Sequence, residues 1–250
     1  MKMTVLEIIQ EVLSYIDGDE VDAWDDTTES EQVYTIVKAT YFNMMSNRNW
    51  PHLRKGVTVA TLADVNTPTH MVLADTIKEL CFINYDVATT TDTRKKYTEL
   101  KYLSAEEFIH RTNQEDDSLS EVQVVTDLSG IELMIRNDRA PTYYTSFDDE
   151  NLVMNSFDSA VSATLETAKV QAQAYVLPSW TDETDAFIPD LPDDAFRSLV
   201  ENCKSTASQS LIQTADPKAE QEATRQSRWL SRNARRVEGG VKFASFGRRK

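Results

Sequence analysis

The residues that could carry out chemistry in this 250-residue chain are few and scattered. The three histidines, His52, His70 and His110, stand singly, and the two cysteines, Cys81 and Cys203, are far apart. Zinc sites and disulfide frameworks both need cysteines or histidines at short, regular spacings. We therefore expect no metal site, and two free thiols in a reducing compartment.

Paired carboxylates are the remaining source of acid–base chemistry. Asp148 with Asp149, and the cluster of Asp182, Glu183 and Asp185, could supply them if two groups were held in different environments. Both sets fall in expected turns, where aspartates commonly shape the backbone. With six glycines and no glycine-rich phosphate loop or nucleophile elbow, the sequence predicts a protein that is not an enzyme and holds no cofactor.

Charge is divided unevenly along the chain. Residues 225–250 contain nine basic residues and one acid, Glu238, which leaves 17 basic and 40 acidic residues, a net charge of −23, in the other 224. An acidic body argues against nucleic-acid binding over the whole surface, because phosphate recognition needs clustered Lys and Arg. An acidic body with a basic end is typical of an interaction tail.

Helices are expected at both ends of the chain. Apolar residues recur at helical spacing, with capping signals at Thr28/Glu31, Ser104/Glu107 and Asp216-Pro217 and with Pro192 as a first helical residue. The predicted helices cover 4–16, 28–47, 105–113, 192–214 and 217–236. The tryptophans Trp50, Trp180 and Trp229, each beside an element end, are expected to pack in the core or as a lid over it.

Strands are expected in the middle of the chain, where the apolar period changes to two. They cover 55–60, 78–87 and 96–103, with hairpins over 121–136 and over 142–147 with 151–157. Residues 164–177 alternate like a strand but contain helix-favouring Ala and Gln, and we interpret them as a strand. Residues 178–191 form a long connection. After Gly239-Gly240, residues 241–246 alternate like a strand that has no partner adjacent in sequence.

The predicted fold class is α+β. An α-helical bundle is formed from both chain ends, residues 1–50 and 190–236, and an antiparallel β-subdomain, residues 51–189, is inserted between them. Residues 237–250 form an extended C-terminal arm. No stretch is long and apolar enough for a membrane span or a signal peptide, so we expect synthesis in the cytoplasm and no membrane partner.

Several short motifs occur in a characteristic order. Arg48-Asn49-Trp50-Pro51 closes a two-helix unit, and the segment PTYYTSFDD at 141–149 leads into Leu152-Val153-Met154. Thr164-Leu165, Pro178 and the segment FIPDLP at 187–192 follow. From about residue 4 to 236, this order resembles the head-to-tail adaptor proteins of short-tailed bacteriophages, also called tail tubular protein A or gatekeeper-type adaptors.

The resemblance implies a structural virion protein at the portal vertex, made in the host cytoplasm. It implies a ring, expected to be dodecameric, that joins the portal protein to the tail nozzle or tail fibres and passes genomic DNA through its lumen without sequence-specific binding. An acidic body would repel the DNA in transit. In that family a C-terminal arm reaches the portal, and the matching residues here are Arg225, Arg228, Arg232, Arg235, Arg236, Val241, Phe243, Phe246, Arg248 and Arg249.

The ring interface is expected to involve helices 28–47 and 192–214, because their apolar stripes are wider than one partner helix requires. Two other function classes stay open. One is a phage-associated hydrolase with an unrecognised acidic site, and the other is a monomeric binding module with a basic tail that binds nucleic acid.

Overall fold

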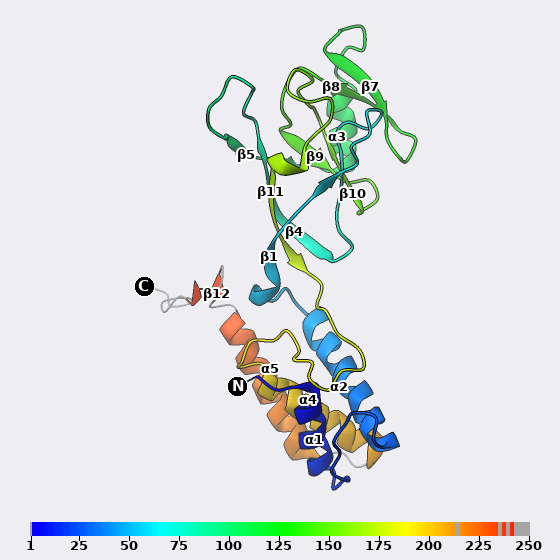
Figure 1. The fold of residues 1–250 in the computed structure, drawn as a ribbon, viewed down its shortest axis with the longest axis vertical. Coiled ribbons are helices and arrows are strands. Elements are labelled where there is room, and N and C mark those ends of the chain that lie inside the picture. Colours follow the sequence, from blue (N-terminus) through cyan, green and yellow to red (C-terminus); the bar gives the residue numbers. More distant parts are fainter. Residues whose placement is uncertain (1, 214–215, 235–236, 239–240, 243–250) are drawn as a thin grey trace. The chain divides into compact units, whose positions relative to one another are not determined.

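The computed structural model describes residues 2–213, 216–234, 237–238 and 241–242. The fold is α+β, as predicted, with helices from both chain ends packed together and β-sheets inserted between them (Figure 1). The chain divides into two compact units. Met1–Arg54 with Leu177–Lys250 form a helical unit, and Lys55–Val176 form a β unit.

The first helix, α1, is Val5–Tyr15 and matches its prediction. A reciprocal capping box starts it: the Thr4 backbone N–H donates to Glu7 Oε2 at 2.8 Å, and the Glu7 N–H donates to Thr4 Oγ1 at 3.2 Å. Both orphan donors at the helix start are thereby satisfied. The apolar side of the helix is buried and consists of Val5, Ile8, Ile9, Val12 and Leu13.

The second helix, α2, is Thr28–Ser46. The predicted capping box of Thr28 with Glu31 is wrong by one residue, because Thr27 is the cap. Its hydroxyl accepts from the Ser30 N–H at 3.1 Å, and Ser30 Oγ accepts from the Thr27 N–H at 3.0 Å. Ser30 is fully buried, and its hydroxyl satisfies the N–H and the carbonyl of Thr27.

The C-terminal helices are α4, Phe196–Leu211, and α5, Pro217–Ala234. The predicted start of α4 at Pro192 is wrong, because the Ala195 N–H donates to the Pro192 carbonyl at 2.8 Å in a separate tight turn before the helix. At the other end, Gln213 has a φ of 57°, the left-handed conformation that stops a helix. The predicted Asp216 cap of α5 is confirmed, since Asp216 Oδ1 accepts from the Lys218 N–H at 2.8 Å.

The connection after residue 176 belongs to the helical unit, which moves the expected boundary at residue 189 back to 176. Trp180 explains this placement. Its ring lies 5.2 Å from that of Tyr41 and 5.0 Å from that of Phe187, and its Nε1–H donates to the Tyr34 hydroxyl at 3.0 Å. The connection therefore covers α2 with aromatic rings. The predicted packing of Trp50 in the core is confirmed, since it is 2% exposed, and the half-buried Trp180 packs as a lid over α2.

The β unit contains two larger sheets and one hairpin. The first sheet has the order β1 (Arg54–Val57), β11 (Val170–Val176), β4 (Ile77–Asp86), β5 (Tyr97–Glu99). The second has the order β2 (Ala60–Thr61), β3 (His70–Val72), β10 (Asn151–Met154), β9 (Tyr143–Thr145), β6 (Lys101–Tyr102). The hairpin pairs β7 (Val122–Thr126) with β8 (Glu132–Arg136). The short helices are 3-10 turns at Pro51–Leu53 and Thr167–Lys169 and the α-helix α3 at Ala105–Thr112.

Two β predictions need correction. The strand expected over 96–103 is split at Leu100, whose N–H donates to the Ile83 carbonyl in the first sheet, whereas the Lys101 N–H donates to Thr142 in the second. The inserted β-structure is also not wholly antiparallel, because β6 pairs in parallel with β9. The long crossover that parallel strands require is supplied by α3 and the β7–β8 hairpin. The predicted strand at the end of the segment 164–177 is confirmed as β11.

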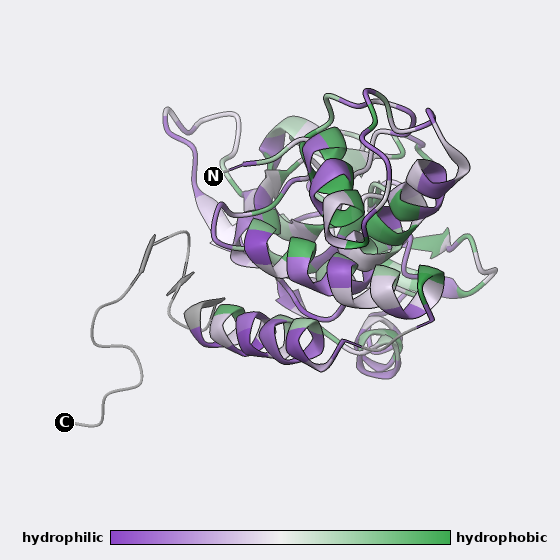
Figure 2. Ribbon diagram, turned by 90° about the horizontal axis from the view of Figure 1, so that it is seen from below, coloured by the Kyte–Doolittle hydropathy of each residue, from purple (hydrophilic) through white to green (hydrophobic). Residues whose placement is uncertain are grey.

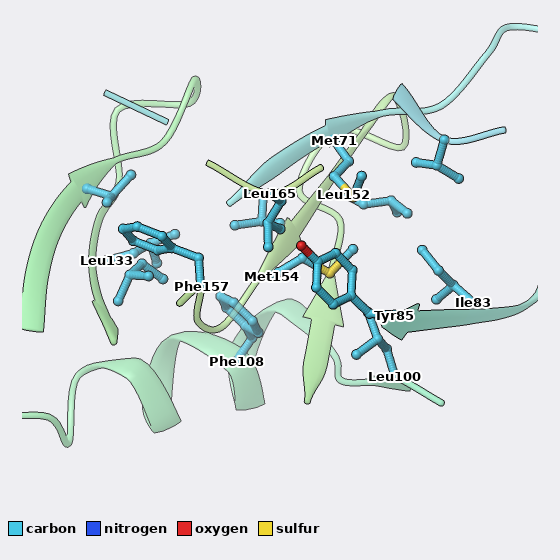
Figure 3. Close-up of a cluster of buried hydrophobic side chains, with 14 of the residues drawn as sticks. Met71, Ile83, Tyr85, Leu100, Phe108, Leu133, Leu152, Met154, Phe157 and Leu165 are labelled. Atoms are coloured by element: carbon cyan, nitrogen blue, oxygen red, sulfur yellow. The ribbon is translucent and has the colours of Figure 1, made fainter. Parts of the chain in front are cut away.

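A single hydrophobic cluster fills the β unit (Figure 3). Side chains from both sheets, the hairpin and α3 meet in it, and Phe108 of α3 is 1% exposed. The labelled members in Figure 3 are Met71, Ile83, Tyr85, Leu100, Phe108, Leu133, Leu152, Met154, Phe157 and Leu165. The unit therefore has a core of its own.

The C-terminal arm differs from its prediction at the two residues where the comparison can be made. Val241–Lys242 pairs in an antiparallel way with Val237–Glu238, in the register Val237↔Lys242 and Glu238↔Val241. The expectation that this segment has no partner strand nearby in the chain is therefore wrong. A Gly-Gly pair between two short strands is a sequence typical of tight hairpins, which is the signal that was missed.

No helix among the described residues is long and apolar enough to cross a membrane.

Candidate interaction surface

Helix α5 presents two different faces. Ala219, Ala223 and Leu230 recur at helical spacing, are at most 5% exposed, and form the side on which the helix packs against α4. Small side chains at two of these positions let the two helices approach closely. The rest of the helix is polar and exposed over most of its length, as the purple colouring of the helix nearest the C-terminal trace in Figure 2 shows.

The outward side of α5 carries what we call the arginine face, formed by Arg225, Arg228, Trp229 and Arg232. Residues 225, 229 and 232 are separated by four and three positions, so they lie in one row along the helix. All four are exposed. Trp229 is 47% exposed, so the expectation that it packs in the core is wrong: the inward positions of this helix are taken by alanines and Leu230.

An open groove of about 1470 Å³ runs beside this face. Its residues come from α5 and from the start of α4, with Asp193, Asp194 and Arg197 on the α4 side. The groove exceeds the roughly 300–1,000 Å³ of a small-molecule site, and nine of its fourteen lining residues are charged. Such a surface is better suited to another macromolecule than to a small apolar ligand.

Apart from Lys218, the charges along α5 change sign from its start to its end. Glu220 and Glu222 precede Arg225, Arg228 and Arg232, an order that the helix dipole favours. Glu222 accepts from Gln226 Nε2 at 2.8 Å and pairs with Arg225 at 3.4 Å. The hydrogen bond from Gln226, with the Arg225 charge nearby, holds the pKa of Glu222 below its ordinary value.

Arg228 and Arg232 are different, since within residues 2–213 and 216–232 neither makes an ion pair. The side chain of Arg225 is 78% exposed despite its contact with Glu222. The arginine face therefore offers positive charge that the described part of the chain neutralises only at one position.

The structure places three of the ten residues assigned to the portal contact, Arg225, Arg228 and Arg232, together on this face. Val241 is described as part of the β12–β13 pair. The other six lie outside the described residues and are Arg235, Arg236, Phe243, Phe246, Arg248 and Arg249. The portal contact itself stays a prediction.

A second charged feature was missed in the sequence. Residues 17–31, which we call the acidic segment, contain eight acids and no Lys or Arg, and they run from the end of α1 into the first turn of α2. Seven of the acids are exposed; Glu29 is half-buried. A scan for local runs of like charge would have found this segment, whereas the net charge of the whole chain conceals it.

The acidic segment is held in place by contacts to its surroundings. Gln10 Nε2 donates to the Val21 carbonyl at 2.8 Å, and the Trp24 N–H donates to Asp185 Oδ1 at 2.9 Å. Val21 is 2% exposed and anchors the middle of the segment in the core. The acids are therefore presented on a fixed backbone.

The expected ring helices are largely used inside the chain. On α2, Val33, Val37 and Tyr41 are fully buried, because α1, α4 and the Trp180 connection cover them. On α4, which packs against α1, α2 and α5, Leu199 and Cys203 are fully buried as well. The apolar stripes that suggested a ring interface over 28–47 and 192–214 thus satisfy packing within the helical unit.

The groups that could carry out chemistry lie elsewhere and serve structural roles. Asp148 Oδ1 accepts from the N–H groups of Glu150 at 3.0 Å and Asn151 at 2.8 Å, which confirms that it forms a turn. Asp182 pairs with Lys38. Both cysteines are free, and burial raises the pKa of Cys203 to about 12.

One buried pair, His70 with Asp127, superficially suggests a catalytic triad. His70 Nε2 lies 2.8 Å from Asp127 Oδ1, and the Ser129 hydroxyl also bonds Asp127. In a serine triad the hydroxyl contacts the histidine rather than the aspartate. His70 is also only 1% exposed, which denies access to a substrate. The pair instead joins the β7–β8 turn to strand β3.

In the part of the chain that the structure describes, no group of three or more His, Cys, Asp and Glu could hold a metal ion. No known protein-family model matches the chain, and comparison with curated proteins finds no match.

Proposed function

We propose that this chain is a structural virion protein, the head-to-tail adaptor of a short-tailed bacteriophage. Copies of it form a ring, dodecameric by the resemblance, that joins the portal to the tail nozzle or fibres and continues the DNA channel. The observation that carries the proposal is the helical unit built from both chain ends, with a β unit inserted and an exposed basic surface on its last helix.

Two of the motifs behind the resemblance, at 48–51 and 187–192, lie in the helical unit on either side of the inserted β unit. Trp50 follows α2, its Nε1–H donates to the Met44 carbonyl at 3.1 Å, and the Arg48 guanidinium lies 4.0 Å from the centre of its ring. Phe187 returns to the helical unit, where its carbonyl accepts from the Val5 N–H at 2.8 Å. These contacts support an architecture in which both ends of the insertion are fixed to the bundle.

The charge distribution supports a DNA channel that does not bind its cargo. Phosphate contacts from Lys and Arg would slow transit, and 224 of the 250 residues carry a net charge of −23. Repulsion between this body and DNA lets the genome pass. The basic residues are concentrated at the C-terminal end, where we propose that the chain attaches to the portal.

The test is whether the chain belongs to the particle and which part attaches it. Mass spectrometry of gradient-purified particles should find the protein in the tail vertex, and a chain lacking residues 239–250 should fold but attach poorly to DNA-filled heads. The deletion leaves α5 intact and removes four basic residues. Recovery of the protein only from the cytosol of infected cells would contradict the virion assignment.

The alternative is that the basic end of the chain contacts DNA. The exposed Trp229 supports this alternative, because aromatic rings stack on unpaired bases. The two uses differ in attachment to heads whose portal channel is closed by protein. Portal docking predicts that the full-length chain still attaches to them, whereas DNA contact predicts no attachment and a steep loss of DNA affinity with salt.

A further inference from the structure

The arginine face and the acidic segment belong to the same helical unit, and no ion pair joins them within its described residues. The hydroxyl of Tyr15, the last residue of α1, bonds Asp216, the cap of α5, so α5 starts beside the end of α1. The acidic segment begins only two residues after Tyr15. Arg232 is 16 residues beyond Asp216, about 24 Å along the helix axis. Figure 1 shows α5 running away from the dark-blue connection between α1 and α2.

Neither surface is neutralised within the described part of the chain. None of the eight acids of the acidic segment makes an ion pair there, and neither do Arg228 and Arg232. A fixed run of acids repels itself, and a row of arginines does the same. The two surfaces complement each other in sign, but no ion pair joins them within the described part of one copy.

We propose that the arginine face of one copy docks on the acidic segment of the next copy. This inference deepens the ring part of the proposed function by naming the two surfaces that join neighbours. Because the two surfaces differ, the contact is head-to-tail, and repeating it gives a closed ring or an open filament. The portal contact then falls to the basic residues that follow Ala234.

Two properties of the surfaces favour a specific contact over loose attraction. Trp229 stands between Arg225 and Arg232, and exposed Trp and Arg are the residue types that most often dominate interface energies. The acidic segment is fixed by Val21 and by the Trp24 N–H bond to Asp185, so little ordering is needed on docking. Several charges acting together exceed the small contribution of an isolated surface pair.

A second copy is a better occupant of this face than DNA. Each chain supplies one acidic segment for each arginine face, so the two surfaces match in number. A DNA duplex that reached the arginine face would also approach a body of net charge −23, which repels it. Association should weaken with salt, because its steering charges are exposed.

Charge reversal and mixing test the contact on the full-length chain. The variant R228E/R232E makes the arginine face acidic, and D22K/D25K lowers the net charge of the acidic segment from −8 to −4. Within the described residues, none of these four side chains makes a hydrogen bond or an ion pair. R94E/K95E is the matched control, since both positions are exposed in the β unit and the charge change equals that of R228E/R232E. Sedimentation velocity at low salt over a concentration series measures self-association.

We expect the wild-type chain and R94E/K95E to self-associate with concentration. Each of the other two variants alone should associate at least tenfold more weakly, because R228E/R232E places acids against acids and D22K/D25K halves the negative charge that faces the arginines. An equimolar mixture of the two should recover association, since every contact between unlike copies is again complementary. Recovery would exclude misfolding of either variant as the cause.

The proposal is overturned if the wild-type chain stays monomeric at every concentration, if R228E/R232E associates as the wild type does, or if the mixture does not recover. It is also overturned if R228E/R232E loses affinity only for added duplex DNA. The experiment uses neither portal nor particles. Failure here would leave the adaptor function standing, and absence from particles would leave this contact standing.

Discussion

The helical unit and the β unit differ in how some of their charged groups are paired. In the β unit, His70 meets Asp127 in a buried pair, and the half-buried Arg136 is held by Glu115 at 3.1 Å and Asp138 at 2.7 Å. The helical unit carries an acidic surface and a basic surface that are exposed and make few ion pairs among the described residues. Exposed charges that contribute little to folding remain available for binding. We therefore expect the helical unit, rather than the β unit, to make the contacts between copies.

The largest expected change in stability is a difference between substitutions of two aromatic residues, one in each unit. Phe108→Ala, in the core of the β unit, should lower the free energy of unfolding by about 3–5 kcal/mol, because it removes a fully buried ring and leaves a cavity. Trp229→Ala should change it by less than about 0.5 kcal/mol, since that ring is exposed.

Urea denaturation of both variants provides the measurement, and self-association provides the second readout. Trp229→Ala should weaken association although it folds normally. A large loss of stability on Trp229→Ala would show that α5 needs this ring for folding and would break the comparison.

The next effect concerns the buried pair of the β unit. Asp127→Ala should cost about 2–4 kcal/mol, because it leaves His70 and the Ser129 groups without their acceptor in a buried site. Leu128→Ala, at an exposed position in the same turn, is the control and should cost little. Equal stability of Asp127→Ala and wild type would mean that the pair does not hold the hairpin turn to β3.

The same pair predicts a pH dependence. Burial raises the pKa of Asp127, but hydrogen bonds from Ser129 and His70 outweigh it, so the folded-state pKa lies below 3.8. A depressed pKa contributes stability that is present above the unfolded value and is lost as the pH falls through the folded value. Below about pH 4 the free energy of unfolding of the wild type should therefore fall with pH, and that fall should be smaller in Asp127→Asn.

The smallest effect distinguishes two neighbouring threonines in the helical unit. Thr27→Ala should cost about 1 kcal/mol, because the Thr27 hydroxyl caps α2. Thr28→Ala should stay within about 0.5 kcal/mol, since Thr28 is exposed and already helical. If thermal unfolding showed a larger loss of stability for Thr28→Ala than for Thr27→Ala, Thr28 would be the cap, as the sequence suggested.

These threonines show what the sequence could and could not predict. Helix periodicity located α1, α2, α3 and α5 within a residue or two, because it depends on local spacing. The cap of α2 was misplaced by one residue, since two adjacent threonines fit the same pattern and the choice depends on how Ser30 is buried. The split of a strand at Leu100 depends on pairing with two different sheets, which no local pattern encodes.

The candidate surface was predictable in part for the same reason. The basic residues of α5 share a face by spacing alone, so Arg225, Arg228 and Arg232 were found. The exposure of Trp229 was not predicted, because it depends on which side of α5 packs on α4. The placement of the start of α5 beside the end of α1 was not predictable either, because the Tyr15–Asp216 contact joins residues 201 positions apart.

Electron cryomicroscopy of the portal vertex of purified particles tests the central claim most directly. The account predicts a closed ring of this chain beneath the portal, with Arg228 and Arg232 of each copy against residues 17–31 of the next and with the basic residues after Ala234 on the portal. A vertex without this chain, or single copies of it lying on DNA, would contradict the account.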